Sequence, residues 1–119
     1  MLWMALTFVA SGAVLIGFAV PLIRRRVAPN WWYGVRVRAT FADEWVWYEA
    51  NAASGRDLLA VGVLLVVLAS TLPFAGLSED AFALTLCAVS VVGALVVAFV
   101  GIRRANRLLA ARRASDQTV

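Results

Sequence analysis

Three long apolar segments without a charged side chain constrain this chain more than any other feature. They are Leu2–Ile23, Leu58–Leu77 and Ala81–Ile102. Each has about 20 residues, and a helix of that length rises about 30 Å, the thickness of the hydrocarbon core of a bilayer. A soluble chain of 119 residues, 63% of them hydrophobic, could not enclose three such helices. We therefore predict an all-α integral membrane protein, in which residues 1–119 form one domain of three transmembrane helices.

The first segment is expected to remain in the mature protein rather than to be cleaved as a signal peptide. No basic residue precedes it, arginines follow it, and its apolar stretch is longer than the usual h-region. Only a short acidic connector, Ser78–Asp80, separates the second and third segments. Those two helices should therefore form an antiparallel hairpin.

The basic residues are all arginines, and they indicate the orientation of the chain in the membrane. They gather in a first connector, residues 24–57, and in a tail, residues 103–119, which an even number of crossings places on the same side. The positive-inside rule makes that side cytoplasmic, so we predict the N-terminus outside and the C-terminus inside. The arginines expected to meet anionic lipid are Arg24, Arg25, Arg26, Arg103, Arg104 and Arg107.

The charged and polar residues do not form a pattern typical of nucleic-acid binding, metal binding or catalysis. A net charge of +4 is accounted for by arginines that orient the helices, so no nucleic-acid partner is expected. The chain has no histidine and one cysteine, which leaves no metal site, disulfide or cofactor site. The acids Asp43, Glu44, Glu49 and Asp57 lie near the interface, but Glu49 and Asp57 lack the spacing of a nucleophile or metal partner, and Asp57 is expected to be an acid at a helix N-terminus. We predict a protein that is not an enzyme.

The first connector is the part of the chain in which recognition is expected, because loops that only join helices are rarely so rich in aromatic residues. Its first half should be extended, with Gly34 at a turn. Thr40, three residues before Asp43, should cap a short amphipathic helix from Phe41 to about Ser54 at the membrane interface. On that helix Trp47, Asn51 and Gly55 share one face with Thr40. These polar residues either hold the connector in shape or contact a ligand.

Small residues at intervals of four mark faces on which helices can approach closely. Ala13 and Gly17 form such a pair in the first segment, and Ser90, Ala94 and Ala98 form a stripe in the third. The pattern leaves open whether the packing partner belongs to the same chain.

The connector also resembles the motif of the SdpI family of bacterial membrane proteins. The family's spacing N-x-W-Y-G-x-R-x-x-x-T, followed by W, N or H, and G, matches this sequence in order, although Val37-Arg38-Ala39 replaces a small-Pro-aromatic run. The resemblance implies a single three-helix unit of a family whose best-known member is longer. That member protects a cell from its own secreted peptide toxin and sequesters a transcriptional repressor. The residues matched, which we predict as binding residues, are Asn30, Trp32, Tyr33, Gly34, Arg36, Thr40, Trp47, Asn51 and Gly55.

Two functions follow as hypotheses. The first is an integral-membrane binding module for immunity or signalling, which engages a peptide toxin, a repressor or a lipid through the connector. The second is a small accessory subunit that fills an interface in a larger bacterial membrane complex. Three helices bury little surface of their own, so a homo-oligomer or a larger complex is expected in both cases.

Overall fold

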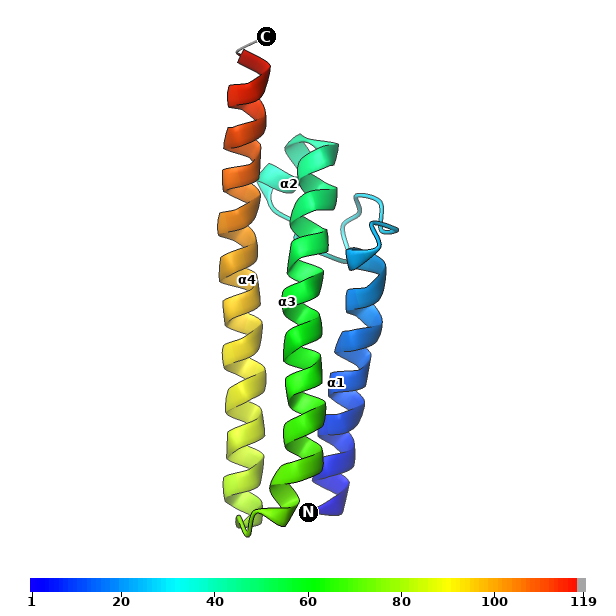
Figure 1. Ribbon diagram of the computed structural model, residues 1–119, viewed down its shortest axis with the longest axis vertical. Coiled ribbons are helices and arrows are strands. Elements are labelled where there is room, and N and C mark those ends of the chain that lie inside the picture. The colour runs from blue at the N-terminus through cyan, green and yellow to red at the C-terminus, as the bar shows by residue number, and fades with distance from the viewer. Residues whose placement is uncertain (118–119) are drawn as a thin grey trace.

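The computed structural model describes residues 1–117, and in these residues all the regular structure is helical (Figure 1). The molecule is a rod of 61 × 22 × 19 Å in which three long helices run side by side. The elements are α1 (Leu2–Ile23), α2 (Arg38–Ala42), α3 (Glu44–Thr71), the 3-10 turn η1 (Leu72–Phe74) and α4 (Glu79–Gln117).

The three long helices are each apolar and long enough to cross a membrane, which confirms the predicted number of spans. At most 17% of the residues in any of their most apolar windows are buried inside the molecule. Their apolar side chains therefore face outward, and an apolar solvent is needed to cover them. This arrangement is that of a multi-pass membrane protein.

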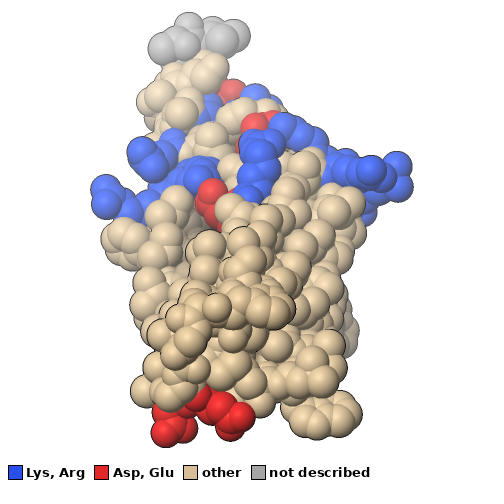
Figure 2. Space-filling view, turned by 60° about the horizontal axis from the view of Figure 1, so that its bottom comes forward, with Lys and Arg blue, Asp and Glu red and all other residues tan. Residues whose placement is uncertain are grey.

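The charged residues are distributed along the rod as the sequence predicts. On the visible face, acids gather at one end and arginines toward the other, with a broad band between them that carries neither (Figure 2). Asp80 and Arg103 bound this band on α4, and the 22 residues between them correspond to about 33 Å of helix. This length matches the hydrocarbon core of a bilayer.

Helix α3 is the centre of the bundle, because α1 and α4 both pack mainly against it (Figure 1). Near the acidic end, a small core joins Leu65 and Ala69 of α3 to Phe82 and Leu86 of α4. The rings of Phe82 and Phe8 meet edge to face with their centroids 6.5 Å apart, so α1 closes the same core.

The close approach of α1 to α3 occurs at Gly12 and not at the predicted pair. A Cβ atom on Gly12 would lie 2.7 Å from the carbonyl oxygen of Gly62, whereas one on Gly17 would meet nothing within 4 Å. Ala13 is exposed as well. The sequence left open whether the partner of Ala13 and Gly17 lies in the same chain, and α3 is not that partner, because a shift of one residue turns a helix face by about 100°.

The second span begins earlier than predicted. The expected short helix from Phe41 to Ser54 is not a separate element. The helical conformation is interrupted at Asp43, and from Glu44 the chain forms one helix to Thr71. Asp43 has extended backbone, and its carboxylate accepts hydrogen bonds from the N–H groups of Trp45 at 2.8 Å and Val46 at 3.3 Å. Asp43 is therefore the N-cap of α3, and the prediction that Thr40 caps this helix was wrong.

The basic tail continues α4 as a helix and packs against the connector. Ala105, Leu108 and Leu109 contact a cluster that contains Ala39 and Ala50. The end of α4 thus covers α2 and the first turns of α3. Thr118 and Val119, the last residues of the predicted tail, lie outside the described residues.

Candidate functional site

Two buried side chains on one face of α3 hold the part of the connector that precedes this helix, residues 24–43, against it. Trp47 and Asn51 are four residues apart, and both are almost fully buried. The indole Nε1–H of Trp47 donates to the carbonyl oxygen of Val27 at 2.8 Å. The Oδ1 atom of Asn51 accepts the N–H of Val35 at 2.5 Å, while its amide nitrogen donates to the Trp47 carbonyl at 2.9 Å. Two points of the connector are thereby fixed to one helix.

Two glycines of the motif sit where a side chain would not fit. Gly34 has a φ of +102°, and a Cβ atom there would lie 2.5 Å from Oδ1 of Asn51. A Cβ atom on Gly55 would lie 3.0 Å from Cβ of Leu22 and 3.1 Å from the carbonyl oxygen of Ala19, both on α1. Gly34 therefore permits the turn that brings Val35 to Asn51, and Gly55 permits the approach of α1 to α3.

Asn30 and Thr40 have local structural roles. The Oδ1 atom of Asn30 accepts the N–H groups of Trp32 at 2.9 Å and Tyr33 at 2.8 Å, which forms a tight turn. The Thr40 hydroxyl accepts the N–H of Val37 at 3.0 Å and donates to the Val37 carbonyl at 2.9 Å. Both side chains shape the connector through bonds to their own neighbourhood.

The connector covers one end of a hollow between α1 and α4, which we call the connector pocket. Its volume is about 760 Å³. Asn51, Ser54 and Leu58 of α3 form its base, and connector residues including Trp32 and Arg36 lie at its mouth. Its walls come from α1 and α4 and are apolar: Leu15, Phe18, Leu22, Val97, Ala98 and Ile102.

Tyr33 joins the connector to α1 at the edge of the pocket. Its hydroxyl donates to the carbonyl oxygen of Phe18, and the two rings meet edge to face with centroids 5.4 Å apart. Partial burial raises the pKa of the Tyr33 phenol, so the hydroxyl remains a donor at neutral pH. The aromatic pair thus fastens the connector over the apolar wall.

Arg36 brings a positive charge to the pocket. One of its guanidinium nitrogens donates to the carbonyl oxygen of Trp31, and within residues 1–117 no carboxylate lies within 4 Å of it. Other arginines at this end have acidic partners. These pairs are Arg25 with Glu49, Arg104 with Asp57 at 3.1 Å, and Arg112 with Asp43 at 3.5 Å.

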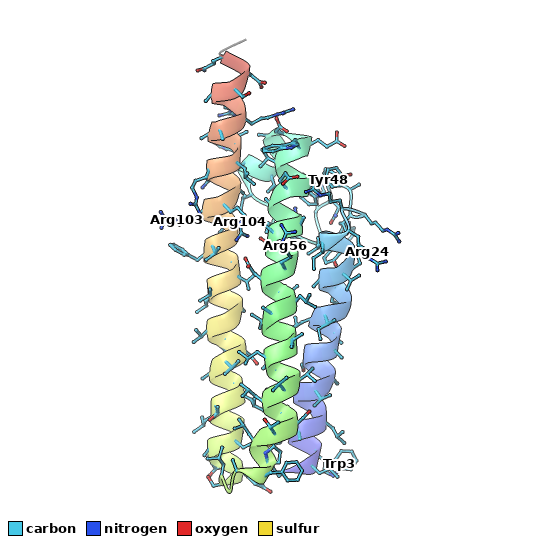
Figure 3. The ribbon with its side chains drawn as sticks, in the orientation of Figure 1. Trp3, Arg24, Tyr48, Arg56, Arg103 and Arg104 are labelled. Carbon is cyan, nitrogen blue, oxygen red and sulfur yellow. The ribbon has the colours of Figure 1, made fainter. Side chains whose placement is uncertain are left out.

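These ion pairs change the interpretation of three charged residues. Asp57 is not at a helix N-terminus as predicted, because α3 begins at Glu44, and it instead joins α3 to α4 through Arg104. Arg104, predicted to face lipid, turns toward α3 for the same reason (Figure 3). Arg25, also predicted to meet lipid, bonds Glu49. In the described chain no three potential metal ligands come together.

Other predicted lipid-facing arginines remain exposed. Arg24 and Arg103 are among them, and together with Arg56 they lie at a similar level along the rod, whereas Trp3 lies at the opposite end (Figure 3). Arg26 and Arg107 are also exposed. The arginine level marks the depth at which headgroups are expected.

The structure divides the predicted binding residues into two groups. One group lines the connector pocket, namely Trp32, Tyr33, Gly34, Arg36 and Asn51. The other group supports it from outside, namely Asn30, Thr40, Trp47 and Gly55. The sequence left two roles open for the polar residues, which either hold the connector in shape or contact a ligand. Asn30, Thr40, Trp47 and Asn51 make hydrogen bonds that hold the connector in shape.

Sequence reasoning missed the walls of the pocket and Ser54. Ser54 lines the pocket, and its buried hydroxyl has no hydrogen-bond partner among residues 1–117; a Cβ atom on Gly101 would lie 2.9 Å from it. The stripe through Ala94 and Ala98 was the available signal, since both alanines line the pocket. The apolar residues of α1 gave no signal, because every residue near them is also apolar.

A model described as the SdpI/YfhL protein family matches residues 26–103. The match covers the connector, α3 and the part of α4 up to the arginine level, well over half of the chain. No curated protein and no solved structure matches the chain.

Proposed function

Because the chain belongs to the SdpI/YfhL protein family, we propose that it is a non-enzymatic binding module of the bacterial inner membrane, with its connector on the cytoplasmic side. The ligand is a peptide, a regulator or a lipid, and it enters the connector pocket. Membership of the family and the three apolar helices support the membrane setting of this proposal.

The observation that carries the proposal is the position of the pocket relative to the motif. Bonds from Asn51 and Trp47 fix the connector, and the fixed connector forms the mouth of a hollow with apolar walls. A concave apolar surface with a few placed polar groups is the usual form of a ligand site. The motif thus determines the shape of a pocket even where its side chains would not touch the ligand.

The charged groups near the pocket favour binding over catalysis. Glu49, Asp57 and Asp43 each hold an arginine, and Asp43 also caps α3. A general acid or base needs a proton-transfer partner at hydrogen-bond distance and a route to substrate. These carboxylates have structural partners instead.

Co-purification tests the proposal with a matched pair of variants. Ala98→Phe fills the pocket, whereas Ala13→Phe adds the same bulk to an exposed position on α1 that does not line it. Each full-length variant is isolated from native membranes in mild detergent, and bound small molecules and peptides are identified by mass spectrometry. We expect a ligand that is present in the wild type and in Ala13→Phe and is lost in Ala98→Phe; equal retention in both would refute the proposal.

The accessory-subunit function is the second candidate, and two exposed tryptophans favour it. Trp31 and Trp32 of the connector are 77% and 87% exposed, and such rings are enriched at protein interfaces and at headgroups alike. The same purification separates the candidates. Foreign subunits at fixed stoichiometry, retained by Ala98→Phe but lost when both tryptophans are replaced by serine, would support the accessory function.

A further inference from the structure

We propose that the connector pocket holds one anionic phospholipid, with an acyl chain between α1 and α4 and the phosphate at Arg36. The inference rests on the proposed function, of which it specifies the ligand. It follows from the size of the pocket, its side walls and the charge at its mouth.

The pocket is too small to enclose a membrane-spanning peptide helix. A helix about 10 Å wide and 30 Å long occupies about 2,400 Å³. The pocket has about 760 Å³, which lies within the range of sites for small ligands. An acyl chain is a narrow apolar ligand that is already present at high concentration beside the protein.

The walls of the pocket suit an acyl chain that enters from the side. Along α1 they extend from Leu15 to Leu22, and along α4 from Ala94 to Ile102, about 10 Å of helix on each side. Both helices pack mainly on α3 rather than on each other, so the space between them faces the surrounding bilayer. A lipid tail can fill this space without crossing a polar barrier.

The charge at the mouth suits a phosphate. Arg36 donates one bond to the Trp31 carbonyl, and its guanidinium has further N–H groups that find no carboxylate within residues 1–117. A guanidinium binds phosphate oxygens through two parallel hydrogen bonds. Arg24, Arg56, Arg103 and Arg104 lie at a similar level in Figure 3, and arginines are expected at the depth of lipid headgroups. Arg36 is the pocket-lining member of this basic end.

Lipid titration followed by native mass spectrometry tests the assignment. The full chain, delipidated in mild detergent, is titrated with phosphatidylglycerol and with diacylglycerol of the same chains, which lacks the phosphate. We expect one saturable phosphatidylglycerol molecule, bound about tenfold more tightly than diacylglycerol, because hydrogen bonds to charged groups are the strong ones. Glycerol phosphate, which carries the headgroup chemistry without the tails, should not displace it.

Two pairs of variants locate the two halves of the lipid. Arg36→Gln removes the charge and keeps a polar side chain with N–H donors, and it should weaken phosphatidylglycerol binding about tenfold. Arg38→Ala, which removes an exposed arginine that does not line the pocket, should leave binding unchanged. Ala98→Phe should abolish binding of both lipids, and Ala13→Phe should not; circular dichroism confirms that each variant is folded.

The outcomes separate the lipid inference from the function on which it rests. Equal phosphatidylglycerol binding by wild type and Arg36→Gln, or an equal loss in Arg38→Ala, overturns the phosphate assignment. Binding that survives Ala98→Phe overturns the acyl site. If phosphatidylglycerol does not bind but another ligand is lost in Ala98→Phe, the lipid inference fails and the proposed function stands.

Discussion

The Oδ1 atom of Asn51 accepts a hydrogen bond from the backbone N–H of Val35 at 2.5 Å, across 16 residues of sequence. The bond joins the membrane-crossing helix α3 to the connector that precedes it. Asn51 is only 2% exposed, so water cannot take the place of the Val35 N–H as the donor to its oxygen. The mouth of the connector pocket is therefore fixed from inside the bundle.

Gly34→Ala is expected to destabilise the protein by about 1–3 kcal/mol, because a non-glycine residue at this φ is strained and its Cβ would collide with Asn51. In an Asn51→Ala background the collision is gone, so the same substitution should cost at least about 0.5 kcal/mol less. Thermal unfolding of the four proteins in detergent measures this difference. Strictly additive effects would show that the two residues do not interact.

Gly12→Ala is expected to lower stability by about 1–3 kcal/mol, since the added methyl group would lie 2.7 Å from the Gly62 carbonyl oxygen. Gly17→Ala is the control. It should be neutral or raise stability by up to about 1 kcal/mol, because the position is open and alanine favours the helix. Unfolding in mixed micelles compares the two, and a larger loss for Gly17→Ala would contradict the packing of α1 on α3.

Arg104→Ala is expected to destabilise the bundle by about 1 kcal/mol more than Arg103→Ala. Arg104 pairs with Asp57 at 3.1 Å, whereas Arg103 lies over the Phe99 ring of its own helix, 5.6 Å from its centroid. Removing Arg104 leaves the Asp57 carboxylate without its partner at the edge of the apolar band. The double variant Asp57→Asn/Arg104→Ala should recover part of the loss in the same unfolding assay, and no recovery would argue against the pair.

Cysteine labelling in whole cells should place the acidic end outside and the end of α4 inside. In a Cys87→Ala background, Phe74→Cys at an 88% exposed position should react with a membrane-impermeant maleimide. Ala114→Cys, exposed near the end of α4, should react only after the cells are lysed. The reverse pattern would invert the predicted orientation and would place the connector pocket on the outer side.

The spans and the family could be predicted closely from the sequence, because both depend on residues that are near one another in the chain. The predicted first span coincides with α1, and the predicted third span lies within α4. The second span and the short helix expected before it were placed wrongly, because both belong to α3, which begins at Glu44. Thr40 and Asp43 are both good N-caps, and which of them starts α3 depends on bonds that the connector makes after folding.

The positions of the site residues could be predicted less well. The spacing placed Trp47, Asn51 and Gly55 on one face, and the structure confirms that this face meets the connector and α1. The ion pair of Arg104 with Asp57 joins residues 47 positions apart, and no spacing rule relates them. The tail was expected to contact headgroups, but Leu108 and Leu109 pack against the connector.

The sequence by itself determined the solvent of this protein, since uncharged stretches long enough to cross a bilayer leave no alternative to a lipid environment. It also determined the motif, because the motif residues other than Trp32 make bonds or avoid collisions that their own chemistry requires. Only the tertiary structure decided that α1 and α4 flank α3 and leave a pocket between them. Within an apolar segment all faces are similar, so packing against neighbouring helices, rather than burial from water, selects which face meets which.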